Sequence, residues 1–418
     1  MREIISQTGG CFSAADILLP EGVDLRCWAV IACDQFTSQP EYWDHVRRMT
    51  ENKASACHLI LPECDLTGDT ETATQDIHRE MLSCLQRGIL HRFPDCFVYT
   101  ERTLQNGELR LGLVGKVDLE RYDYSGTKDT EIRATEETVS ERIPPRMAVR
   151  RGAALELPHM LLLCDDDRMH VIEPLGERKN HLPKLYDFDL MMDGGHVAGW
   201  LVQGKEKEAL ELRIAEYESR ERSKHPGAEL LYAVGDGNHS LATAKACYEE
   251  LKKQHPNEDL TGHPARFALC ELNNIHDPSQ KFEPIHRIVK HCEPEKLIRD
   301  LNTAFQSSEG TEIPWVSGGK RGVLHIDCCD GLLPLSALQT FLDRWLPENG
   351  GELDYIHGEA ALNALENQEG SIGFCLPAID KNSLFPGILS GGVLPRKTFS
   401  MGEPEEKRYY LEARRILP

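Results

Sequence analysis

The sequence lacks any hydrophobic stretch long enough to cross a membrane. Its longest apolar runs, such as Trp28 to Cys33 and Met160 to Cys164, have the length of β-strands, whereas a membrane-spanning helix needs about 20 apolar residues. The first residues, Met1-Arg-Glu-Ile-Ile, include a basic side chain but no sustained apolar core before a cleavage site, so no secretory signal is visible. We therefore expect a cytoplasmic protein that does not contact membranes.

The cysteines lack the patterns of a disulfide scaffold or a zinc site. All 14 are scattered along 418 residues without a C-x-x-C pair, and disulfide scaffolds are typical of small secreted chains. Cys57, His58 and Cys64 are close enough in sequence for zinc, but a second ligand pair is missing. Reduced, structural thiols are the simpler interpretation.

The chain also lacks an excess of basic residues, because its formal net charge is −21. Nonspecific nucleic-acid binding needs clustered Lys and Arg to displace counterions, so we expect none. A local basic pocket can still bind a small phosphorylated ligand, since a cleft focuses the field locally.

Several common enzyme signatures are absent. The sequence contains no G-x-x-x-x-G-K-[ST], no H-E-x-x-H and no G-x-S-x-G. The easy assignments to P-loop enzymes, zinc proteases and α/β-hydrolases are therefore excluded.

Segments typical of strands and helices alternate along the chain, which predicts a mixed α/β (α+β) fold with more than one domain. The run Leu161 to Cys164 and the run Met169 to Ile172 flank three aspartates and predict a hairpin. Lys205 to Arg222 has strong helix formers and predicts a long helix. The Pro226-Gly227 turn after it is the expected boundary between an N-terminal α/β region with inserted hairpins (1–225) and a C-terminal α/β region (226–418).

One turn carries the strongest chemical signal. The segment Gly235-Asp-Gly-Asn-His-Ser240 joins an expected buried strand, Leu230 to Val234, to an expected helix, Ser240 to Lys253. Gly235 and Gly237 permit positive φ and close approach of a ligand to the backbone. The first N–H groups of a helix have no internal partner and lie at its positive end, which suits phosphate.

The polar side chains of this turn have two interpretations. Asn238, His239 and Ser240 can add donors to a bound phosphate, and Asp236 can hold Mg²⁺ beside it or accept a proton from a hydroxyl nucleophile. Alternatively, Asp236 or Asn238 caps the helix and His239 fills a polar gap.

The turn resembles the D-G-H-H-R-x-x-x-A signature of a family known as domain of unknown function 1015 (DUF1015). Four further blocks in the same order are similar to that family: Arg133-Ala-Thr-Glu-Glu-Thr, Phe282-Glu-Pro-Ile-His-Arg-Ile-Val, Asp354-Tyr-Ile-His-Gly and Leu394-Pro-Arg-Lys-Thr-Phe. The chain is identified as a member of the family, whose biochemical function is not established.

A more distant resemblance links this turn to the phosphate-binding turn of the ParB and sulfiredoxin superfamily, which includes free-serine kinases. The resemblance implies a ParB/sulfiredoxin-like strand–loop–helix unit, with Asp236 as a catalytic or metal-facing carboxylate and His239 at the phosphate. The chain departs from the pattern, because Asn238 replaces the first His and Ser240 replaces the Arg. Losing that guanidinium removes a bidentate phosphate clamp, so phosphate binding needs cations from elsewhere.

Three regions can supply such cations. Arg133, Arg142 and Arg146 lie in a charge-dense segment that also holds Glu136 and is interrupted by a Pro-Pro pair. His286 and Arg287 lie among apolar residues, where a cation needs a buried partner or a ligand. Arg396-Lys397 follows a Gly-Gly turn, and each of these cations can alternatively be solvated surface charge. Asp34 is a candidate carboxylate at the end of the first apolar strand, or simply a turn residue or helix cap.

The leading hypothesis is a nucleotide- or phosphate-binding enzyme, phosphotransferase-like, that acts on a small polar metabolite. The expected cofactors are ATP or ADP, with Mg²⁺ between Asp236 and the phosphates. The first rival is a non-catalytic nucleotide-binding, regulatory module of the ParB type. The second is an inactive structural relative, which the loss of the motif arginine allows.

Overall fold

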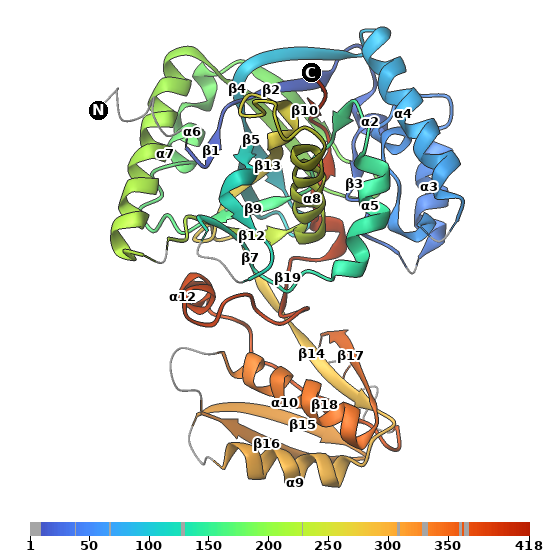
Figure 1. The fold of residues 1–418 in the computed structure, drawn as a ribbon, viewed down its shortest axis with the longest axis vertical. Helices are drawn as coiled ribbons and strands as arrows, with labels where there is room; N and C mark the ends of the chain where they lie inside the picture. The colour runs from blue at the N-terminus through green and yellow to red at the C-terminus, as the bar shows by residue number, and fades with distance from the viewer. Residues whose placement is uncertain are drawn as a thin grey trace. The chain divides into compact units, whose positions relative to one another are not determined.

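The computed structural model describes residues 10–37, 39–66, 68–126, 130–227, 229–306, 310–327, 333–358, 362 and 368–418. Two compact units divide the chain (Figure 1). Unit 1 comprises residues 1–134, 138–280 and 403–418, and unit 2 comprises 135–137 and 281–402. The turn at Pro226-Gly227, expected as the domain boundary, lies inside unit 1.

Unit 1 is built on a large mixed sheet with the strand order β10-β11-β4-β5-β13-β9-β12-β7-β6, while β1 pairs with β5 and β2 with β4. Two short pairs, β20-β3 and β21-β8, tie the end of the chain to this unit. The strands of unit 1 are β1 (Phe12–Ser13), β2 (Ala15–Pro20), β3 (Val30–Ile31), β4 (Leu90–Thr103), β5 (Leu109–Asp118), β6 (Tyr122–Asp123), β7 (Ile132–Ala134), β8 (Leu155–Glu156), β9 (Leu161–Cys164), β10 (Lys184–Asp189), β11 (His196–Val202), β12 (Tyr232–Asp236), β13 (Phe267–Asn274), β20 (Tyr409–Tyr410) and β21 (Arg414–Arg415).

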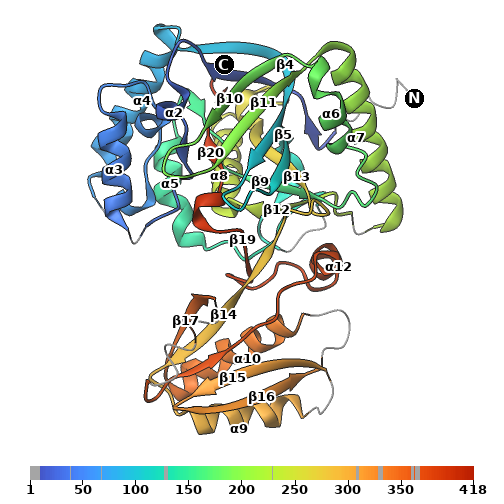
Figure 2. The ribbon, with the colours of Figure 1, turned by 180° about the vertical axis from the view of Figure 1, so that it is seen from behind.

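Helices cover both faces of this sheet. Successive strand residues point to opposite sides, and apolar residues on both sides pack against helices. On β4, Phe97 and Tyr99 belong to a core with α6, α7 and α8, whereas Cys96 and Val98 belong to a core with α3 and α4. Figures 1 and 2 show these helices from the two sides of the unit. The helices of unit 1 are α2 (Leu25–Trp28), α3 (Pro40–Thr50), α4 (Thr70–Gln86), α5 (Ile143–Arg150), α6 (Glu173–Arg178), α7 (Gly204–Lys224) and α8 (Asn238–Gln254), with short 3₁₀ turns that include η1 (Ala56–Leu59) and η2 (Glu63–Asp65).

Unit 2 has its own sheet, with the strand order β16-β15-β18-β14-β17 and with β19 paired to β14. The helices α9 and α10 pack against it through a separate apolar core around Val289, Leu301, Leu338 and Phe374. Its elements are β14 (Phe282–Lys290), α9 (Pro294–Phe305), β15 (Thr311–Ser317), β16 (Lys320–Ile326), α10 (Pro334–Asn349), β17 (Glu352–His357), β18 (Ile372–Phe374), α12 (Lys381–Gly391) and β19 (Phe399–Met401).

The expected mixed α/β fold is confirmed, and two local predictions are wrong. Met169 to Ile172 is not the second strand of a hairpin: the Asp166 carboxylate accepts the backbone N–H groups of His170 and Val171 and turns the chain into α6. The Pro-Pro pair of the charge-dense segment begins α5 instead of interrupting a helix, since the first turn of a helix needs no N–H bonds from these positions.

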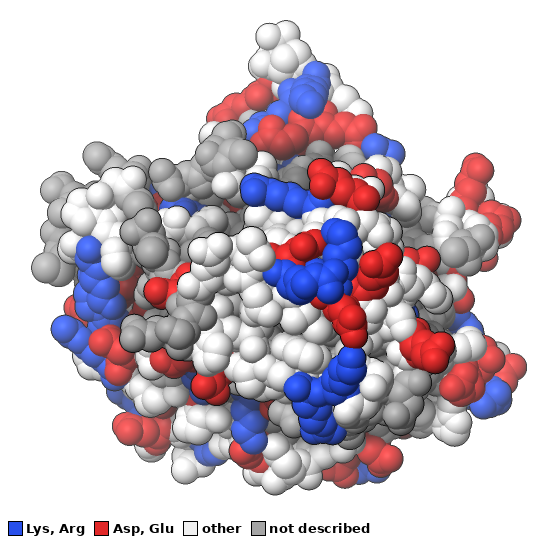
Figure 3. Space-filling model, turned by 90° about the horizontal axis from the view of Figure 1, so that it is seen from below, with Lys and Arg blue, Asp and Glu red and all other residues white. Residues whose placement is uncertain are grey.

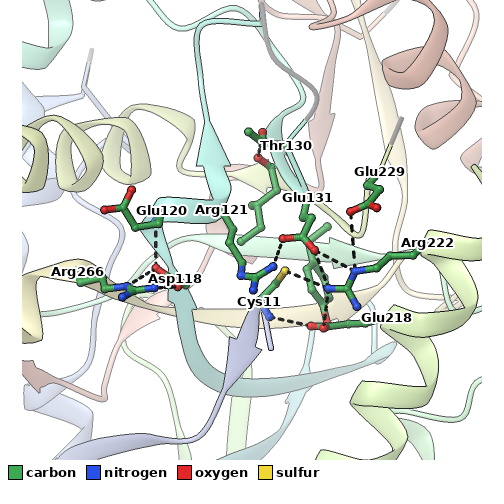
Figure 4. A network of polar contacts seen from close by, with 12 residues as sticks. Cys11, Asp118, Glu120, Arg121, Thr130, Glu131, Glu218, Arg222, Glu229 and Arg266 are labelled. Carbon is green, nitrogen blue, oxygen red and sulfur yellow. Dashed lines mark hydrogen bonds and ion pairs between the residues drawn. The ribbon is translucent and has the colours of Figure 1, made fainter. Parts of the chain in front are cut away.

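A partly buried ionic network lies at one edge of the unit 1 sheet (Figure 4). Glu131 accepts from Arg121 and, at 2.6 Å, from Arg222, which also lies 3.2 Å from Glu218. Glu218 accepts the backbone N–H of Cys11 at 3.0 Å. Burial, Glu218 and Glu131 raise the pKa of the Cys11 thiol well above its ordinary value, so this thiol is protonated and structural.

The described cysteines are all free of disulfides, and Cys328 and Cys329 lie outside the described residues. Cys57, His58 and Cys64 do not form a metal site: no group of three His, Cys, Asp or Glu side chains able to hold a metal occurs among the described residues. His58 instead bonds to the carbonyl of Thr50 through Nε2.

Surface charges of both signs are mixed on the face drawn in Figure 3, where no continuous basic field covers the described residues. None of the helices in the described ranges has the length and hydropathy that a membrane crossing requires.

Candidate functional site

Gly237 makes the turn between β12 and α8 possible. It has a left-handed backbone, with φ of +79°, and it is the residue that precedes the helix. A Cβ atom at this position would lie 2.9 Å from Cγ and 3.0 Å from Cα of Met160. Glycine is therefore required twice over, by conformation and by space.

The start of α8 leaves two backbone N–H groups unoccupied. The N–H groups of Ser240 and Leu241 both donate to the carbonyl of Gly237, at 3.0 and 3.1 Å. No acceptor for the N–H of Asn238 or His239 occurs in the described part of the chain, and no side chain caps the helix. This helix is 17 residues long, so the dipoles of its peptide groups add up to a partial positive charge at its N-terminus. The two N–H groups lie at that end, as an anion site requires.

Neither Asp236 nor Asn238 caps the helix, so the capping half of the structural alternative is wrong. One oxygen of Asp236 accepts the N–H of Gly237 at 2.9 Å, and the other lies 3.3 Å from Nζ of Lys407. Oδ1 of Asn238 is buried without a partner among the described atoms. A buried, unpaired acceptor is uncommon in a folded protein and points to a missing ligand or water.

His239 is held as a neutral imidazole. Its Nε2 accepts the backbone N–H of Val139 at 3.2 Å, and a backbone N–H can only donate. Burial, Arg146 and Arg142 lower its pKa to about 4, against the opposing effects of Glu63 and Asp34. At neutral pH, His239 can therefore offer only an Nδ1–H donor.

Sheet pairing brings further groups to the turn. Strand β9 runs antiparallel to β12, and Leu161 pairs with Asp236, so the residues just before β9 meet the start of α8. His159 consequently lies with Nε2 3.0 Å from Oγ of Ser240 and Nδ1 2.7 Å from the hydroxyl of Tyr410.

The end of the chain delivers Lys407 and Tyr410. In the β20-β3 pair, Tyr410 lies opposite Val30, which places Lys407 beside the residues that follow β3. Burial alone would raise the pKa of Asp34, but His159, a hydrogen bond from Gln35 and Lys407 hold it below its ordinary value. Asp34 is thus an ionised carboxylate near the same lysine that pairs with Asp236.

Two arginines, Arg142 and Arg146, belong to the charge-dense segment that contacts the turn, where the N–H of Val139 donates to His239. Nη2 of Arg146 is 2.8 Å from Glu63, and its Nη1 donates to the carbonyl of Arg142. Arg142 and Arg146 supply positive charge near Ser240, the position where the family motif has arginine.

Other predicted phosphate ligands are already occupied by the protein. The guanidinium of Arg133 donates to the carbonyls of Thr130 and Glu229 inside unit 1. In unit 2, Nδ1 of His286 accepts the N–H of Leu376. Arg133 and His286 therefore have structural contacts that account for their burial.

Arg287 and Glu136 also have protein partners, within unit 2. Arg287 is fully buried and donates to Gln339 and to three backbone carbonyls, those of Ile285, Arg396 and Lys397. The carboxylate of Glu136 accepts the backbone N–H groups of Lys397, Thr398 and Phe399. Burial raises the pKa of Glu136 despite these three donors.

Sequence reasoning missed His159, Lys407, Tyr410 and Glu63. Each comes from a segment far along the chain, and no local motif marks any of them. Only knowledge of the β9-β12 and β3-β20 pairings could have found the first three.

A family model described as "Protein of unknown function (DUF1015)" matches residues 17–414. The chain belongs to the DUF1015 family. The sequence blocks that resemble the family all fall within this range. No curated protein matches the chain.

Three solved structures resemble this DUF1015 protein at low similarity. A free serine kinase in complex with AMP is 14% identical, with a TM-score of 0.37 over 71% of this chain and 90% of that chain. SbnI from Staphylococcus aureus with a C-terminal truncation is 9% identical (TM-score 0.37; 69% and 82%). A conserved hypothetical protein from Pyrococcus furiosus is 14% identical (TM-score 0.36; 70% and 92%). With TM-scores this low, we draw no functional argument from them.

Proposed function

We propose that the turn at Gly235–Ser240 of unit 1 binds the phosphate of a nucleotide and that the protein is a small-metabolite phosphotransferase. The observation that carries the proposal is the pair of unoccupied N–H groups of Asn238 and His239 at the start of α8. The pairing of Lys407 with Asp236 at 3.3 Å supports the proposal. So do Arg146, which helps to lower the pKa of His239, and Asp34, whose pKa Lys407 helps to lower. The choice of a nucleotide rests on the sequence resemblance of the turn to the ParB and sulfiredoxin superfamily.

The residues divide the work of phosphoryl transfer, which depends mainly on positioning and electrostatics. Asn238 and His239 donate backbone N–H bonds to the phosphate, and the neutral His239 adds its Nδ1–H. Lys407 balances the negative charge in place of the motif arginine, and Arg146, which is paired with Glu63, adds a smaller contribution. Asp34, which is ionised, accepts the proton of the attacking hydroxyl, and Asp236 orients Lys407.

Mg²⁺ has an incomplete protein site here. Both oxygens of Asp236 are engaged, one by the N–H of Gly237 and one by Lys407. Mg²⁺ is commonly held by one or two carboxylates together with substrate phosphates, so Asp34 and Asp236 are the residues that would hold it. No step of the proposal requires it.

Binding of ATP and ADP, with and without Mg²⁺, tests the first half of the proposal. A ligand present at 100 times its Kd stabilises the folded protein by about 2.7 kcal/mol, which thermal unfolding detects as a shift of several degrees. Lys407→Met should weaken binding at least about tenfold, the effect of losing roughly 1.4 kcal/mol. Lys207→Met is the matched control, because Lys207 is a similarly covered lysine that pairs with Asp95 on another face.

Turnover tests the second half. Asp34→Asn should abolish ATP-dependent phosphorylation of small hydroxylated metabolites, followed by ³¹P NMR, while most nucleotide affinity persists. Nucleotide binding without any phosphorylated product would favour the non-catalytic regulatory module. The absence of any thermal shift with nucleotides or inorganic phosphate would contradict both.

A further inference from the structure

Beside the turn, unit 1 contains a cavity of about 150 Å³, whose lining includes Ser240 of the turn and Arg146. Its walls are mainly apolar and come from the η1 region, α4, α5 and the segment before β9. Met81 and Met160 are buried in these walls, whereas Ile60, Leu61 and Val149 are only half-buried. The protein therefore keeps apolar surface partly open to solvent next to a polar site, as ligand pockets do.

Part of the cavity wall is polar. Ser240, His159 and Tyr410 line it and are joined in a row, from Oγ of Ser240 to Nε2 of His159 and from Nδ1 of His159 to the Tyr410 hydroxyl. A serine hydroxyl has one donor and two acceptor sites, and His159 uses only one of them. Ser240 can therefore make a further hydrogen bond to a ligand hydroxyl.

The charged groups of the cavity wall are paired with one another. Arg146 lies 2.8 Å from Glu63, and Arg150 lies 2.5 Å from Glu156. A charged ligand would have to lose hydration in an apolar cavity without an unpaired opposite charge, which is costly. The lining therefore favours an uncharged ligand.

We propose that this cavity binds a small uncharged alcohol with a compact apolar body, whose hydroxyl meets Ser240. Apolar cavities of about this volume accept molecules of the size of benzene. A nucleobase fits less well, because its ring nitrogens and amino group need several polar partners and most of the lining is apolar. If the proposed function holds, this alcohol is the phosphate acceptor, in place of the polar metabolite expected from the sequence. Its oxygen forms a bond to the γ-phosphorus of ATP, the bond from that phosphorus to the bridging oxygen breaks, ADP leaves, and the hydroxyl proton goes to Asp34.

Benzyl alcohol is the probe for this cavity. In protein labelled with ¹³C at the methionine methyl groups, it should shift the signals of Met81 and Met160 and leave the methionines outside the cavity unmoved. Leu61→Trp should remove these shifts by filling the cavity. Leu82→Trp is the matched control, because Leu82 is 49% exposed on α4 and does not line the cavity.

Ser240→Ala tests the hydrogen bond to the ligand hydroxyl separately from the apolar contacts. It should weaken benzyl alcohol about fivefold, the value of one hydrogen bond near 1 kcal/mol, and leave toluene binding unchanged. Val149→Phe fills the cavity from α5 and serves if Leu61→Trp does not fold.

Two results would overturn the inference: Met81 and Met160 signals that do not move, or shifts that persist in the filled variants. ATP and ADP binding, measured on the same samples, separates this inference from the proposed function. Alcohol binding without nucleotide binding contradicts the phosphotransferase and the acceptor role. Nucleotide binding without alcohol binding contradicts only the cavity.

Discussion

Arg287 on β14 of unit 2 and the turn after β12 of unit 1 both place polar groups at the end of, or within, apolar strands. The guanidinium of Arg287 donates hydrogen bonds to Gln339 and to three backbone carbonyls, and it lies over the ring of Tyr355, 4.6 Å from the ring centroid. At the turn, by contrast, the N–H groups of Asn238 and His239 have no acceptor among the residues that the structure describes. Burial of a charge among apolar residues therefore does not indicate a ligand site, whereas donors and acceptors without protein partners do indicate one.

Removing the guanidinium of Arg287 should produce the largest effect. Arg287→Met leaves buried acceptors unpaired and should lower the free energy of unfolding of unit 2 by about 3 kcal/mol or more. Arg287→Lys should recover little, since a lysine cannot reach several carbonyls with a planar fork. Hydrogen exchange of peptides from β14 and β15 measures the loss.

The control for Arg287 lies on the same strand. Lys290 pairs with Asp354, which is half-exposed, so Lys290→Met should change stability by less than about 1 kcal/mol. Equal effects of Arg287→Met and Lys290→Met would show that Arg287 is not a structural centre of unit 2. Its role as a phosphate ligand would then return to consideration.

Gly237→Ala, in the turn after β12 of unit 1, should have the next largest effect on the free energy of unfolding. The left-handed conformation costs a non-glycine residue roughly 1–2 kcal/mol, and the contact with Met160 adds about 1–3 kcal/mol of overpacking. Gly88→Ala is the matched control, because Gly88 has φ of +67° and nothing within 4 Å of an added Cβ. Urea denaturation of the two variants isolates the steric part, and similar losses would mean that Met160 yields freely.

Local sequence rules predicted the turn itself but not its surroundings. The glycine at 237, the strand before it and the helix after it follow from backbone chemistry within a dozen residues. His159 meets Ser240 from 81 residues away, and Lys407 arrives with the last strands of the chain. Such partners depend on which strands pair, and neither periodicity nor composition encodes strand order.

Buried charge shows the same limit. The sequence correctly indicated that a cation among the apolar residues Ile285, Ile288 and Val289 needs a partner. It could not say that the partners of Arg287 would be backbone carbonyls, because every residue carries one and none is visible as a motif. The prediction that Pro144-Pro145 interrupts a helix was wrong for a simpler reason. Proline breaks a helix in its interior, but it is favoured in the first turn, where this pair lies.

The pH dependence of the turn should show an intermediate effect. The pKa of His239 is about 4 in the folded protein and about 6.5 when unfolded. Between these values the unfolded chain binds more protons, so folded stability is fully present above pH 6.5 and declines as the pH falls toward 4. His239→Gln keeps an acceptor for the N–H of Val139 and should flatten this decline in the melting temperature.

A bound anion should change the same titration. Phosphate at the N–H groups of Asn238 and His239 favours a positive imidazole, so ADP should raise the pKa of His239 above 4. Nuclear magnetic resonance of the imidazole, with and without ADP, measures this rise. An unchanged pKa under saturating ADP would place the phosphate away from the start of α8.

The smallest effect belongs to Ser240, which sits where the family motif has arginine. Ser240→Ala removes the hydrogen bond to Nε2 of His159 and should cost about 1 kcal/mol of folding stability, a fall in melting temperature of roughly 2–4 °C. The hydroxyl of Ser223, which bonds only to the carbonyl of Ser219 on an exposed part of α7, is the control, and Ser223→Ala should be nearly neutral. Because Lys407 and Arg146 supply the charge, Ser240→Ala should leave ADP affinity almost intact; a loss as large as that of Lys407→Met would mean that the serine, and not the distant cations, replaced the arginine.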